Sequence, residues 1–134
     1  MAAWAERTAP SLDALAEIAE AALARLPAVV REAAAGCVLR VADWPDEETL
    51  AELDAEAIEI TGLYRGLALT ERSVAEWGTL PDEIWLYRRP ILDEWAERGD
   101  VPLGNLVAHV LVHEIAHHFG WSDDDIAAVD AWWR

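Results

Sequence analysis

The sequence has one cysteine, no lysine and no long apolar run, and each shortage excludes a class of protein. Cys37 is the only cysteine among 134 residues, so the chain forms no internal disulfide and no cysteine-based zinc cluster. No run reaches the roughly 20 apolar residues that a membrane-spanning helix needs. Residues 1–10 lack the basic start and apolar segment of a signal peptide. We therefore expect a cytoplasmic protein without a membrane partner.

Basic charge is also scarce. All ten basic residues are arginine, they face 26 acidic residues, and the formal net charge is −16. Such a charge repels a phosphate backbone, which argues against nucleic acid as a partner. The length and a hydrophobic fraction of 54% predict one globular domain over residues 1–134 with a real core. The oligomeric state stays open.

Hydrophobic periodicity predicts an α+β fold, with a small sheet of about three strands packed on helices. The expected helices are 12–26, 46–59, 91–98, 101–118 and 122–133, and Pro27 either ends the first of them or begins a second short helix to residue 35. The expected strands are 37–42 and 83–88. Gly62 and Gly66 bracket residues 63–65, and a loop or short strand follows to Ser73. Ser11 is the expected N-cap of the first helix, and Asp100 that of the helix from residue 101. We expect Pro90 to close the second strand.

The chemistry of the chain is concentrated in residues 113–123, which read HEIAHHFGWSD and fit the pattern HExxHxxGxxD. Residues four apart on a helix share a face, with Cβ atoms about 5–6 Å apart. His113 and His117 can therefore bind one metal ion, and neutral imidazole suits Zn2+. Glu114 lies about 100° further round the helix. There it can border the open coordination position as the general base for a metal-bound water.

The residues around HExxH strengthen this interpretation. Gly120 tolerates a positive φ, so the helix can end and the chain can turn back with Asp123 as a possible third ligand. The helix itself is apolar on nearly every side, which is typical of a buried helix. Most of its polar residues are spaced by four along one stripe, with Glu114 beside it: Asn105, His109, His113 and His117. Buried polar groups are costly unless paired, and a metal ion would pair this stripe.

Two structural explanations compete with the metal site. The histidines can be satisfied core or surface residues. Ser122 can cap a last helix, in which case Asp123, Asp124 and Asp125 are acids that suit the helix dipole.

The motif is similar to the signature HExxHHFGxxD of the small bacterial zincin-like metallopeptidases. The similarity covers roughly residues 37–126 and includes the segments GLYRG (62–66), LTERS (69–73), LPDEI (80–84) and YRRPI (87–91). It implies a minimal zincin-like fold with a buried HExxH helix, and zinc-dependent cleavage of a peptide or protein substrate. By resemblance, the zinc ligands are His113, His117 and Asp123. Glu114 is by resemblance the catalytic base.

The proposed hydrolysis needs a donor for the tetrahedral oxyanion. The candidates are Tyr64, Arg72, Tyr87 and Arg88, although each of them also suits a structural hydrogen bond. In zincin folds a strand above the active helix can pair with an extended substrate. Residues 84–88 are our candidate for that strand.

Two other functions remain open. One is a metal-dependent ribonuclease resembling the bacterial rRNA-maturation factors, which share a helix with two histidines and a third ligand after a glycine. The net charge of −16 and the glutamate beside His113 count against it. The other is a non-catalytic zincin-like binding module with a structural metal. The open fourth position and Glu114 favour catalysis.

Overall fold

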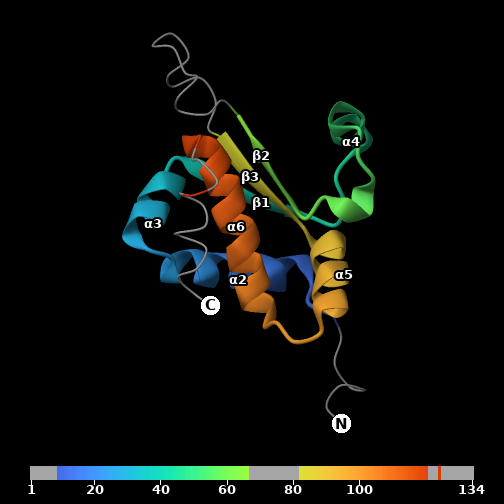
Figure 1. The fold of residues 1–134 in the computed structure, drawn as a ribbon, viewed down its shortest axis with the longest axis horizontal. Coiled ribbons are helices and arrows are strands. Elements are labelled where there is room, and N and C mark those ends of the chain that lie inside the picture. The colour runs from blue at the N-terminus through green and yellow to red at the C-terminus, as the bar shows by residue number, and fades with distance from the viewer. Residues whose placement is uncertain (1–8, 67–81, 121–123, 125–134) are drawn as a thin grey trace.

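The computed structural model describes residues 9–66, 82–120 and 124, and within them a small mixed sheet packs on helices (Figure 1). The elements are α2 (Leu12–Arg25), α3 (Ala28–Ala34), β1 (Cys37–Ala42), α4 (Glu47–Leu53), the 3-10 turn η1 (Ala57–Glu59), β2 (Gly62–Arg65), β3 (Asp82–Tyr87), α5 (Arg88–Arg98) and α6 (Leu103–Phe119). The predicted α+β class is confirmed. The prediction of a single domain over residues 1–134 stays a prediction.

The strand order of the sheet in the described residues is β1–β3–β2. β1 runs parallel to β3, whereas β2 runs antiparallel to it. β3 is therefore the central strand, with both of its edges paired. Our expectation that residues 84–88 offer an edge to a substrate is wrong. Alternating apolar residues report which face of a strand is buried, but they carry no information about the order of strands.

Helix α6 runs through the middle of the molecule and contacts α2, α3, β2 and β3 (Figure 1). Its most deeply buried side chains are Leu106, Val107, Leu111, Val112 and Ile115. They form one core with Ile84 and Leu86 of β3 and with apolar residues of α2 and α3. The prediction of a buried helix is confirmed. No helix among the described residues is long and apolar enough to cross a membrane.

The position of the first helix is predicted correctly, whereas the acidic helix predicted for residues 46–59 is shorter in the structure. The Ser11 hydroxyl accepts a hydrogen bond from the Ala14 N–H at 3.1 Å, as expected of an N-cap. The helix predicted for residues 46–59 ends at Leu53, because Asp54 adopts the left-handed conformation with φ 49°. Aspartate tolerates that conformation better than most residues. A separate 3-10 turn follows at η1.

Two predicted boundaries near Pro90 and Asp100 are wrong. Pro90 does not close β3, since α5 begins at Arg88 and holds Pro90 in its first turn. Proline is tolerated there because the first N–H groups of a helix have no partner within it. Asp100 does not cap α6, which begins at Leu103 with Pro102 as its N-cap. The helix expected at 122–133 lies outside the described residues.

The position of Leu86 predicts which apolar side chain the fold depends on. Leu86 is 0% exposed on the central strand, whereas Leu53 at the end of α4 is 43% exposed. Leu86→Ala should lower the free energy of unfolding by about 2–5 kcal/mol, because it leaves a cavity in the core. Leu53→Ala should change it by less than about 0.5 kcal/mol. Urea denaturation of the two variants measures both values, and equal losses would contradict this description of the core.

Candidate metal centre and active site

The three motif residues of α6 differ in their exposure to solvent. His113 is half-buried, and the side chain of His117, one turn later, is 62% exposed. The side chain of Glu114 is only 12% exposed, and its Oε1 lies 3.6 Å from Nδ1 of His117. The carboxylate therefore sits inside the protein while the neighbouring imidazole faces solvent. Gly120 ends the helix in the left-handed conformation with φ 65°, as the sequence predicts.

Within the histidine stripe of α6, the ring of His113 contacts the ring of His109 one turn earlier. The rings of His109 and His113 lie 4.4 Å apart, centroid to centroid, and are inclined by 50°. This contact restricts the ring of His113 from the direction of His109. The stripe expected from the spacing of four is therefore present on the folded helix.

The described residues fit two positions of a zinc site. His113 and His117 provide two imidazoles one helical turn apart, and a catalytic zinc site takes three protein ligands with one open position. In the described part of the chain, no group of three or more His, Cys, Asp or Glu residues could hold a metal ion. A third ligand must then come from elsewhere. Asp123, which the sequence predicts for that position, lies outside the described residues.

Glu114 is enclosed because β2 approaches α6 closely. A Cβ atom added to Gly62 would lie 2.6 Å from Cγ1 of Val110 and 3.2 Å from Cγ of Glu114. Real Cβ atoms essentially never make contacts below 3.0 Å, so no other residue fits at position 62 without movement. The backbone N–H of Tyr64 donates a hydrogen bond to the Glu114 carboxylate. The side chain of Glu114 therefore lies between α6 and β2.

The surroundings of Glu114 raise the pKa of its carboxyl above the usual value. Removal of water by burial is the largest cause, because it disfavours the charged form. The neighbouring His117 and the hydrogen bond from Tyr64 act in the opposite direction without cancelling it. A carboxyl with a raised pKa is suited to accept and return protons near neutral pH.

Two of the four oxyanion candidates are tyrosines, and their hydroxyl groups have different surroundings. The Tyr64 hydroxyl donates to Oδ2 of the buried Asp82 at 2.8 Å. Tyr87 is buried, its ring stacks on Trp85 at 6.2 Å, and burial raises the pKa of its hydroxyl. The alternation of β3 places Tyr87 and Trp85 on the sheet face opposite the core residue Leu86. A structural role suits the Tyr64 hydroxyl, whereas the charge of Glu114 acts on the Tyr87 hydroxyl and adds to the rise of its pKa.

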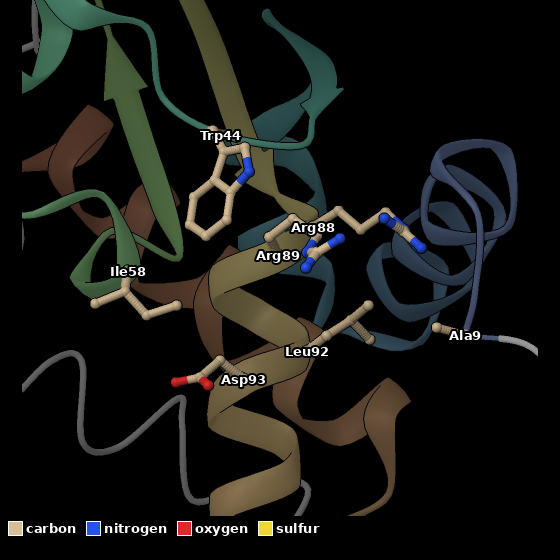
Figure 2. A pocket seen from close by; sticks show the side chains of 7 residues that line it. All are labelled: Ala9, Trp44, Ile58, Arg88, Arg89, Leu92 and Asp93. Carbon is tan, nitrogen blue, oxygen red and sulfur yellow. The ribbon is translucent and has the colours of Figure 1, made fainter.

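Arg88 lies beside Arg89 and Leu92 in a pocket that Trp44 also lines (Figure 2). Its guanidinium donates to Oδ1 of Asp43 at 3.0 Å and to the Pro10 carbonyl. Asp43 directly follows β1, at the opposite edge of the sheet from β2 and Glu114. There Arg88 lines a pocket of about 360 Å³ together with Trp44, Arg89 and other residues. Arg88 therefore links the start of α5 to the segments before α2 and after β1. The fourth candidate, Arg72, lies outside the described residues.

Sequence reasoning missed the contributions of Gly62 and Asp82. In the sequence, Gly62 is recognisable only as one of two glycines, with Gly66, that bracket a short segment. A glycine inside a strand often marks a close approach by another backbone or side chain, and this signal could have identified it. The contact of Asp82 with Tyr64 has no signal in the sequence, because the two residues meet only through the pairing of β2 with β3.

A comparison with known protein families agrees with this geometry. Residues 34–133, well over half of the chain, match the model of the zincin-like metallopeptidase family. The chain therefore belongs to the zincin-like metallopeptidases, and the expected family is confirmed. Among curated proteins, none matches this sequence with significance.

The raised pKa of Glu114 predicts a stability that depends on pH. The folded protein holds the Glu114 proton at pH values where the unfolded chain has released it, so ionisation of Glu114 destabilises the fold as pH rises from about 4.5 through the folded pKa. Glu114→Gln should therefore stabilise zinc-free protein near neutral pH. This gain should vanish below the unfolded pKa, where both forms are neutral. Denaturation of both proteins between pH 4 and 8 tests it, and a gain that does not change with pH would contradict it.

Proposed function

We propose that this protein hydrolyses peptide bonds with a zinc ion held by His113, His117 and Asp123, and with Glu114 as the general base. The observation that carries the proposal is the placement of Glu114. Its carboxylate is largely buried beside the exposed His117 and against an edge strand, on the helix that also presents His113. Membership of the zincin-like metallopeptidases supports the same chemistry.

The chain's own groups divide the reaction between them. When bound, zinc supplies Lewis acidity, which lowers the pKa of coordinated water to about 7 and polarises a carbonyl. Glu114 accepts the proton of the attacking water and then delivers it to the leaving amine.

The edge strand β2 is the proposed docking strand for the substrate, in place of β3. Among the described residues, no strand pairs with the outer edge of β2. The Tyr87 N–H donates to the Thr61 carbonyl at 3.0 Å, so the antiparallel alternation directs the main-chain N–H and C=O of Gly62 away from β3. An extended peptide can add to such an edge as a further strand. It would then lie beside Glu114.

The third zinc ligand can be tested within the run of three aspartates. Asp123→Ala should weaken zinc binding sharply, whereas Asp124→Ala and Asp125→Ala should leave it within a few-fold of the wild type. The reason is that the spacing of six from His117 leaves room for the turn at Gly120, and only Asp123 matches the family signature. Zinc titration against a competing chelator measures all three affinities. Equal affinities would return Asp123 to a capping role.

The base can be separated from the ligands by a single substitution. Glu114→Gln should lower hydrolysis by about 10²–10⁴-fold, the usual contribution of a general base. It should leave the zinc content nearly intact, because the carboxylate binds no metal in this assignment. The assay is cleavage across a bacterial proteome by wild type and variant, with Glu97→Gln on the exposed face of α5 as the matched control. Parallel loss of zinc and activity would contradict the assignment.

A further inference from the structure

The segment GLYRG at residues 62–66 has a role that the proposed chemistry leaves unexplained. Its two glycines stand at places where a side chain would collide with a residue of another segment. At Gly62 a Cβ would meet Val110 at 2.6 Å and Glu114 at 3.2 Å, and at Gly66 it would meet Oδ1 of Asp82 at 2.4 Å. Both glycines thus permit a close approach, one to α6 and one to β3.

Tyr64 lies between the two glycines, and both its backbone N–H and its side-chain hydroxyl donate hydrogen bonds. Its backbone N–H donates to the Glu114 carboxylate, and its hydroxyl donates to Asp82, which is 3% exposed. Tyr64 pairs with Ile84 in the register of the sheet, so the strand around it is anchored to the central strand. The donor that reaches Glu114 is therefore fixed from two directions.

We infer that Gly62 and Tyr64 of β2 are positioning residues for Glu114. Gly62 leaves space for the carboxylate side chain against the strand, and the main-chain N–H of Tyr64 holds the carboxylate by a charge-assisted hydrogen bond. Their effect on catalysis acts through Glu114, so this inference rests on the proposed function. Neither residue contributes a group to the reacting atoms.

The hydrogen bond itself is tested by amide exchange. Nuclear magnetic resonance of the wild type and of Glu114→Ala measures the exchange rate of the Tyr64 N–H. The N–H of Leu63, which points toward Trp85 of β3, is the internal reference. Removal of the acceptor should speed exchange at Tyr64 by about tenfold and leave Leu63 unchanged. An unchanged Tyr64 rate would overturn the inference, even in a protein that is an active peptidase.

The positioning effect is tested by Gly62→Ala, with Gly36→Ala as the matched control. A Cβ at Gly36 meets nothing within 4 Å, so the control adds a methyl group without a collision. Gly62→Ala should lower kcat on unfolded, dye-labelled casein by about 10- to 100-fold, since a displaced catalytic group loses its alignment. The zinc affinity should stay within about threefold, because the three atoms nearest to the added methyl group belong to Val110, Glu114 and Trp85 and not to a zinc-binding histidine.

The outcomes distinguish the inference from the proposed function. A kcat for Gly62→Ala equal to that of Gly36→Ala, or a loss of zinc affinity that parallels the loss of kcat, would overturn positioning. If Gly62→Ala does not fold, the exchange comparison with Glu114→Ala still decides. If wild type and Glu114→Gln cleave casein and the proteome equally, the proposed function itself fails. In that case the contact of Gly62 and Tyr64 with Glu114 would have no role in catalysis, whatever the exchange rates show.

Discussion

The close contact between α6 and β2 is the constraint on which the site depends. A helix and a strand approach this closely only where one of them lacks a side chain, and Gly62 provides that place. The helix cannot retreat, because Leu111 and Ile115 are fixed in the core shared with α2, α3 and β3. Movement of β2 is opposed by its pairing with β3. The space around Glu114 is therefore set by the packing of the whole domain.

This contact separates the environments of two residues that are close on one helix. The side chain of Glu114 is 12% exposed and that of His117 is 62% exposed, although they are only three positions apart. Burial raises the pKa of the carboxyl, while the exposed imidazole remains available to a metal ion from solvent. In the proposed function, Glu114 is then a base with restricted hydration and His117 a metal ligand that solvent can reach.

The sequence predicted those features that local chemistry determines. The cap at Ser11, the end of α6 at Gly120 and the shared face of His113 and His117 depend on residues within one or two turns. The order of the strands could not be predicted, because an alternating strand looks the same at the centre and at the edge of a sheet. The start of α5 was missed for a related reason. Pro90 can end a strand or occupy a first helical turn, and only the folded context decides.

Within the site, the sequence predicted positions along the helix but not the orientation of the Glu114 side chain. The spacing of His113, Glu114 and His117 is fixed by helical geometry. The direction of the Glu114 side chain depends instead on Tyr64, which lies in another segment and acts through its main chain. Every residue except proline has a backbone N–H group, so the identity of a residue does not predict this donor. Only the glycine at position 62 is visible in the sequence. It indicates a close approach by another segment, but the sequence does not show that this segment is α6. By the alternation of β2, Leu63 faces away from α6, so its identity should matter less to the site than that of Gly62.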